Sequence, residues 1–391
     1  MLEALTSFFS QAPQDGLYEM RKKAWEKFLT LGLPEKRDAF QYVSLHRLSV
    51  EMTCSDSVKE GFVEQIPEAS RHSYFVFVNG SLRLDLSDVT ALPESVVVSD
   101  LHSAMRTYGT LLHNRFQKSL QEESNPFVYL NLALHTSGLF LYVPPGVEIE
   151  VPVHCLFVTS GVSAPRLQLF VGKGSILSLV TTTLSLGEGL CNVVTDIQLD
   201  DGARCTTQTE ALALQGSHFH ALRATLKRNA TLKTLSLIDQ GDLFRFDALV
   251  SLLGEGAEAE MRGLWQLDEK SEAHVHIVMD HGAPHTRSLQ KFKGLLEGFS
   301  RSSFEGKILV RQIAQKTEAY QLNQNLVLGE HAQAYSKPNL EIFADDVKAS
   351  HGTTVSQLDP AALFYLKTRG LEEKIARSLL VDAFCHEMRQ S

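Results

Sequence analysis

Hydrophobic positions over most of this chain alternate with other residues at a period of two. The segments 149–157 and 244–250 are clear examples, with Val, Ile, Phe, Cys or Ala at every second position. Alternation of this kind is typical of a strand with one buried face. Starting with the alternating run 128–134, the pattern predicts strands over about two hundred residues with almost no helical period.

Turn residues interrupt these strands at a nearly fixed step. The steps of 28, 28, 27 and 27 residues separate Gly146, Gly174, Gly202, Asn229 and Gly256. Glycine and asparagine both accept a positive φ, so one turn recurs along the chain. A propeller blade would take about 40–45 residues, whereas coils of about 27 residues fit a parallel β-helix whose end coils need caps.

The two ends of the chain have a helical period instead. An apolar stripe over 17–29 stops at Gly32, a hairpin is predicted around Asn79-Gly80, and a helix over 101–121. Asp359-Pro360 has the sequence of a helix start, and Gly370 that of a helix stop before a last apolar stripe.

These patterns together predict a mainly β fold in three parts. An N-terminal helical and α+β region covers 1–125, the parallel β-helix covers 126–355, and a helical region covers 356–391. The two helical regions are the candidate caps of the β-helix.

Composition and charge narrow the function classes. The chain has 37 Lys and Arg against 46 Asp and Glu, a net charge of −9, which argues against a nucleic acid or an anionic membrane as partner. No apolar run approaches the ~18–20 residues of a membrane span, and the first twenty residues do not resemble a secretion signal. We therefore expect a cytoplasmic protein. Its five scattered cysteines, Cys54, Cys155, Cys191, Cys205 and Cys385, are expected to be reduced thiols.

A histidine-rich segment is the first candidate for metal chemistry. It contains His274, His276, His281 and His285. Histidines at positions i and i+2 share one face of a strand, as metal-binding strands require. Because Val275 and Ile277 occupy the presumed core side, we favour a wet outer strand face over a metal site.

A second polar cluster lies where the strand pattern ends, at Asp345, Asp346 and His351. The adjacent carboxylates point to opposite faces of a strand and do not form a general acid–base pair there. No phosphate-binding loop or nucleophile motif occurs in the sequence, so the residues alone nominate no enzyme. A β-helix enzyme and a homodimeric metal-binding β-protein remain the alternatives.

Several segments carry a resemblance to the SufB/SufD family of iron–sulfur cluster assembly proteins. The most specific is 337–355, KPNLEIFADDVKASHGTTV, continued by LFYLKTRG at 363–370. The segments 280–286 and 315–326 belong to the same pattern. The residues from Leu31 to Tyr42, together with chain length, resemble the SufD branch, although that branch more usually has Trp in place of Phe40.

The resemblance implies a right-handed parallel β-helix with helical terminal regions and a non-catalytic role. It further implies a SufB-like sister subunit and a SufC-like ATPase as partners, with self-pairing as another option. A transient Fe–S cluster would form at the sister interface, with His351 contributing and with no cluster held stably by this chain alone. Family members often have cysteine where Ala349 stands here. The ATPase would dock on the C-terminal apolar residues, namely Leu363, Phe364, Leu366, Ile375, Leu379 and Phe384.

Overall fold

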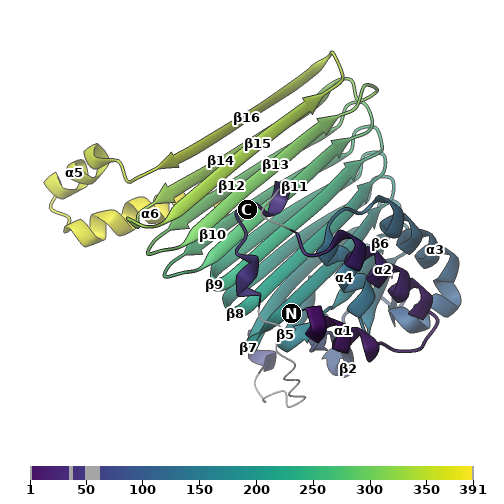
Figure 1. Cartoon of the computed structure of the whole chain (residues 1–391). Helices are drawn as coiled ribbons and strands as arrows, with labels where there is room; N and C mark the ends of the chain where they lie inside the picture. Colours follow the sequence, from purple (N-terminus) through teal and green to yellow (C-terminus); the bar gives the residue numbers. More distant parts are fainter. Residues whose placement is uncertain (1, 35–37, 49–61, 390–391) are drawn as a thin grey trace.

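The computed structural model describes residues 2–34, 38–48 and 62–389 and is mainly β (Figure 1). A parallel β-solenoid of about eight turns forms its centre, as the alternation and the turn spacing predict. Its strands are β4 (Gly138–Val143), β5 (Val153–Ser163), β6 (Arg166–Val171), β7 (Ile176–Leu199), β8 (Arg204–Leu226), β9 (Thr231–Leu252), β10 (Glu258–Leu267), β11 (Glu272–His281), β12 (Arg287–Leu296), β13 (Arg301–Val310), β14 (Thr317–Val327), β15 (Gln333–Ile342) and β16 (Val347–Ser356).

Two parallel ladders run along the two sides of this solenoid. One ladder has the order β5-β7-β8-β9-β10-β12-β14-β16, and the other continues from β9 through β11 and β13 to β15. The long strands β7, β8 and β9 take part in both sides, whereas each later coil is divided into two strands. The strands of both sides place one set of side chains in the lumen between them.

The predicted row of turns is confirmed. Gly146, Gly174, Gly202, Asn229 and Gly256 all have φ between 54° and 73°. The row continues beyond the predicted set to His285 (φ 57°) and Lys316 (φ 59°). Each turn is tied to the next coil, as when Gly202 N–H donates to the Arg228 carbonyl at 2.8 Å. The fixed step in the sequence is therefore one coil of the solenoid.

The lumen changes character along the stack. In the earlier coils it is filled by apolar side chains such as Leu167, Ile197 and Phe244. In β14 the buried positions include Gln321, Asn323 and Asn325 instead. These amides bond to one another, as Gln321 does to Gln290, whereas Phe304 and Ile308 of β13 keep the opposite side of the lumen apolar.

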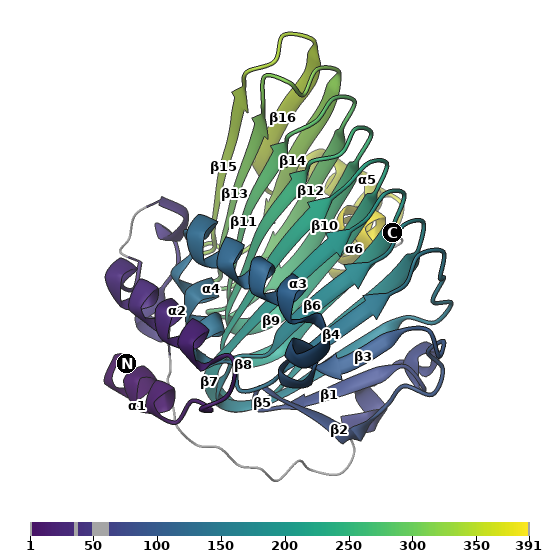
Figure 2. The same cartoon turned by 90° about the vertical axis from the view of Figure 1, so that its right-hand side faces the viewer.

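The N-terminal region packs beside the first coils and adds strands to them (Figure 2). Its helices are α1 (Leu2–Ser10), α2 (Tyr18–Leu31), α3 (Leu101–Glu122) and α4 (Pro126–Leu134), with short 3₁₀ turns at Asp38–Phe40, Leu45–Arg47, Phe62–Gln65 and Glu68–Ser70. Strands β1 (Tyr74–Val78) and β2 (Ser81–Asp88) form the predicted hairpin, with positive φ at Asn79 and Gly80. Strand β1 pairs in parallel with β5, and β3 (Val97–Asp100) pairs with β4.

The predicted strand over 128–134 is wrong, because this segment is helix α4. The Asn125 side chain caps the helix by accepting from Phe127 N–H at 2.9 Å, and Pro126 occupies the first turn. All nine residues of α4 are buried. A helix that is buried on every side has apolar residues at all positions, so the alternation of Val and Leu carried no information about its period.

The C-terminal helices α5 (Pro360–Thr368) and α6 (Glu373–Arg389) begin and end as predicted. The Asp359 carboxylate accepts from Ala361 N–H at 2.9 Å, and Gly370 has φ 88°. These helices flank the solenoid and do not cover the edge of its last coil. Helix α6 packs on the side of the solenoid, where Cys385 and Met388 contact Leu264 of β10 (Figure 1). Within the described ranges, no helix is both long and apolar enough to span a bilayer.

Candidate functional site

The last coil places His351 at the open mouth of the lumen. In the parallel ladder of β14 and β16 it is the register partner of Gln321. Ala349 and Val347, two and four residues earlier on β16, pack against the lumen core, so alternation places His351 on the same side. The imidazole is exposed. One accessible nitrogen ligand therefore stands at the end of the stack.

The outer edge of this coil is open. In the part of the chain that the structure describes, β16 pairs only with β14 and β15 only with β13. Three large apolar side chains near this edge are exposed, namely Ile342, Phe343 and Val355. Pro338 removes one backbone donor from β15, whereas β16 contains no proline. An unpaired edge strand with adjacent apolar side chains is a template for pairing with another chain.

The four histidines of the predicted alternative metal site do not lie together. His274 is fully buried on the outer face, where its ring nitrogens lie 2.8 Å from Ser303 Oγ and 3.1 Å from Glu272 Oε2. His281 is on the lumen side, and His285 is an exposed turn residue. Among the described residues, no group of three or more His, Cys, Asp or Glu side chains is arranged to hold a metal ion.

The prediction that His274 and His276 lie on a solvent-exposed strand face is wrong. The N-terminal segment covers this face, with Ser44 Oγ donating to Glu272 at 2.7 Å. His276 Nδ1 lies 2.8 Å from Asp247 Oδ2 under the same cover. Polar positions on the outer face of β9 and β11 are therefore paired and largely buried, although their alternation with apolar residues suggested solvent.

The described cysteines are unsuited to ligate a metal or to attack a substrate. Cys155, Cys191, Cys205 and Cys385 are free and buried, and Cys54 lies outside the described residues. Burial raises the pKa of Cys191 and Cys205 to about 12. A thiol must lose its proton before it can act as nucleophile or ligand, so these groups are structural at neutral pH.

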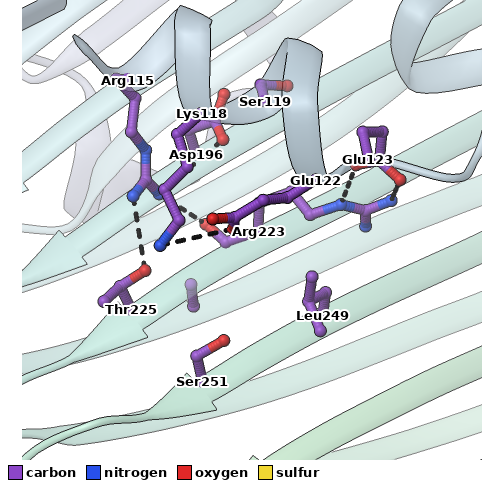
Figure 3. A pocket seen from close by; sticks show the side chains of 11 residues that line it. Arg115, Lys118, Ser119, Glu122, Glu123, Asp196, Arg223, Thr225, Leu249 and Ser251 are labelled. Atoms are coloured by element: carbon purple, nitrogen blue, oxygen red, sulfur yellow. Dashed lines mark hydrogen bonds and ion pairs between the residues drawn. The ribbon is translucent and has the colours of Figure 1, made fainter.

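Sequence reasoning missed a buried ion-pair network between the N-terminal helices and the solenoid (Figure 3). Arg223 Nε lies 2.7 Å from Glu123 Oε2, and its Nη2 lies 2.9 Å from Asp247 Oδ1. Burial opposes the charge of Arg223, but the two carboxylates hold the pKa of the guanidinium above its usual value. Because Glu123 and Arg223 are a hundred residues apart, no local pattern reveals the pair.

A second pair in the same region, Arg166 with Asp196, is also buried, at 2.7 Å. The cavity between these two groups is lined by Arg115, Ser119 and Thr225 and has a volume of about 70 Å³. Because the charged groups of the network pair with one another, we interpret the network as the attachment of α3 and α4 to the solenoid.

The predicted docking residues of the C-terminal helices fall into two groups. Phe364, Ile375 and Leu379 are 68%, 49% and 47% exposed. Leu363 and Leu366 are half-buried. Phe384 packs with α6 on the solenoid, and Lys293 Nζ lies 4.8 Å from its ring centroid. Phe384 therefore belongs to the attachment of α6 and is not on the free face.

Comparison with known proteins covers nearly the whole chain. The model of the SufBD core domain of the SUF system for FeS cluster assembly matches residues 157–384, and the SufBD N-terminal model matches 3–155. An iron-sulfur cluster assembly SufBD family protein of Synechocystis is 28% identical over 95% of this chain and 86% of its own length.

Two further relatives agree. The iron-sulfur cluster assembly protein SufD of Escherichia coli is 26% identical over 69% of this chain and 66% of its own length. A SufBD family protein of Mycobacterium bovis is 35% identical over 49% of this chain and 50% of its own length. With the solenoid, the two helical regions and the family models in agreement, this chain belongs to the SufBD family of the SUF iron–sulfur cluster assembly system.

Proposed function

We propose that this chain is a non-catalytic, SufD-type subunit that pairs with a SufB-like sister through its open last coil. The observation that carries this proposal is the unpaired edge of β16 with His351 on its lumen side. A strand of the sister adds to that edge, and Ile342, Phe343 and Val355 are buried against it. The pairing places His351 at the interface.

In this proposal the nascent cluster is cargo shared by two chains. A neutral imidazole is a good ligand to iron, and His351 is accessible. This chain offers a single nitrogen there, and Ala349 stands on the same face where a family cysteine would add a thiolate. The remaining ligands therefore come from the sister, and no cluster is held by the isolated chain.

The free face of the C-terminal helices is the proposed dock for a SufC-like ATPase. Phe364, Tyr365, Ile375 and Leu379 are all at least 47% exposed. Exposed apolar side chains on two helices that contact each other suit a hydrophobic groove on a partner. Nucleotide-driven movement of the ATPases then pulls on these helices and loosens the sister interface.

The test is anaerobic co-expression with the SufB-like and SufC-like chains, followed by native mass measurement. We expect one complex with one copy of this chain, one sister and two ATPases. Val355→Asp should remove the sister and Phe364→Asp the ATPase. Their controls are Leu253→Asp and Phe299→Asp, which alter similarly exposed residues elsewhere (48% and 61%). A chain that remains a monomer or a homodimer contradicts the proposal.

A further inference from the structure

Three residues of one register position form a polar column at the end of the lumen. Gln290 of β12 is the register partner of Gln321 of β14, and Gln321 is the register partner of His351 of β16. The two glutamines are almost completely buried, at 0% and 3% exposure. Gln321 Nε2 donates to Gln290 Oε1 at 2.9 Å. The column is therefore a short amide ladder that leads to His351.

The last amide of this ladder, on the side of the coil that carries His351, has an unpaired acceptor. Gln321 Oε1 is buried and has no hydrogen-bond partner. A buried carbonyl oxygen without a donor is costly, by about 1–3 kcal/mol in general, and such groups in folded proteins call for an explanation. Because Nε2 of the same amide is bound to the preceding coil, the oxygen is the acceptor that remains for the following coil.

The amide of Gln321 also has little room to move. It reaches across the lumen to Gly306 of β13, where a Cβ atom would lie 1.8 Å from Gln321 Nε2. Adjacent strands of a ladder are about 4.8 Å apart and their register partners point to the same side. In the next coil, His351 of β16 is therefore the register neighbour of Gln321, and Pro338 of β15 is the register neighbour of Gly306.

We infer that Gln321 is the positioning residue of His351. The carbonyl oxygen of Gln321 accepts a hydrogen bond from one ring N–H of His351. That bond fixes the tautomer and leaves the other nitrogen unprotonated and directed away from the lumen. Histidines that ligate metals nearly always donate their second N–H to such an acceptor. Gln290 holds Gln321 in place from the coil behind.

The biological purpose of this hydrogen bond rests on the proposed function, but the bond itself can be tested without it. The tautomer of His351 is measured on the full-length chain alone by ¹⁵N shifts of labelled histidine, with no cluster or partner present. The chain has 15 histidines, so the His351→Asn variant identifies the signals. We expect one protonated and one unprotonated ring nitrogen in the unaltered chain.

The decisive variant is Gln321→Met, which keeps the length of the side chain and removes the acceptor. It should convert His351 to the mixed tautomers of a free imidazole, whereas Gln321→Glu, which keeps an acceptor, should restore a single tautomer. Gln324→Met, on the outward side of the same strand, should change nothing. If Gln321→Met does not fold, Gln290→Met tests the same bond by releasing Gln321.

Unchanged His351 signals in Gln321→Met, or mixed tautomers in the unaltered chain, would overturn the positioning role. Neither result bears on the proposed function. Conversely, full cluster assembly by His351→Ala in the complex would overturn the proposed function and leave the hydrogen bond standing. The two failures are therefore distinguishable.

Discussion

The guanidinium of Arg223 meets the carboxylate of Glu123 at 2.7 Å across the junction between the N-terminal helices and the β-helix. Both side chains are at least nine-tenths buried. A buried charge that loses its partner keeps its desolvation cost, so the pair couples the folding of the two regions. Removing one partner tests that coupling.

We predict that Glu123→Ala lowers the free energy of unfolding by about 2–3 kcal/mol. Asp247 remains 2.9 Å from Arg223 and limits the loss. The control is Glu122→Ala, the adjacent residue, whose ion pair with Lys118 is solvent-exposed and should cost less than about 1 kcal/mol. Urea unfolding of both variants measures the difference. Equal effects would mean that the buried pair does not attach the N-terminal helices.

Acid should destabilise the chain through its buried histidines. Burial lowers the pKa of His218 to about 3 and the pKa of His220 to about 4, against about 6.5 in an unfolded chain. The unfolded state therefore binds more protons below pH 6.5, and stability falls as the pH drops from 6.5 toward 4. Urea midpoints at pH 7.5 and 5.5 should show this loss.

His218→Phe should reduce that acid sensitivity. Both ring nitrogens of His218 lack partners, and the ring stacks on Phe244 with centroids 5.2 Å apart. A phenyl ring keeps the stack without unsatisfied polar atoms, which should add about 1–3 kcal/mol of stability at pH 7.5. His113→Phe, at an exposed position of α3, should retain the acid sensitivity of the unaltered chain. A His218→Phe chain with that same full sensitivity would refute the assignment.

Ala349→Cys should add a thiolate ligand beside His351. Position 349 is on the same face of β16 and is half-buried, so the small cysteine side chain fits. We expect the complex with the sister to retain more iron and acid-labile sulfide after chelator treatment. Ser350→Cys places the same thiol on the opposite face and should give no gain. A gain in both variants would reflect a general effect of an extra thiol.

Features determined by a few neighbouring residues could be predicted from the sequence. The turn row from Gly146 to Gly256, the Asn79-Gly80 hairpin and the Asp359 cap each depend on local φ preferences or local hydrogen bonds. The alternation predicted the strands, and the fixed step between turns predicted that these strands stack as successive coils.

Features that depend on contacts between distant segments could not be predicted. Arg245 and Asp247 occupy the polar positions of an alternating strand, yet the N-terminal segment covers them, with Phe40 3.8 Å from the Arg245 guanidinium. The helix at Pro126–Leu134 is buried on all sides and has no informative period. Only part of the candidate site could be predicted. His351 was identified from the family motif, whereas its neighbour Gln321 could be identified only from the strand pairing of β14 with β16.

The most direct test of the central claim is cluster formation by the three-component complex with His351→Ala. The complex is loaded anaerobically with iron and a sulfide source, and the bound iron and acid-labile sulfide are measured. His331→Ala, at an exposed turn before β15, is the matched control. We predict an intact complex by native mass with cluster content reduced at least tenfold for His351→Ala and unchanged for His331→Ala. Full cluster content in an intact His351→Ala complex would contradict the account.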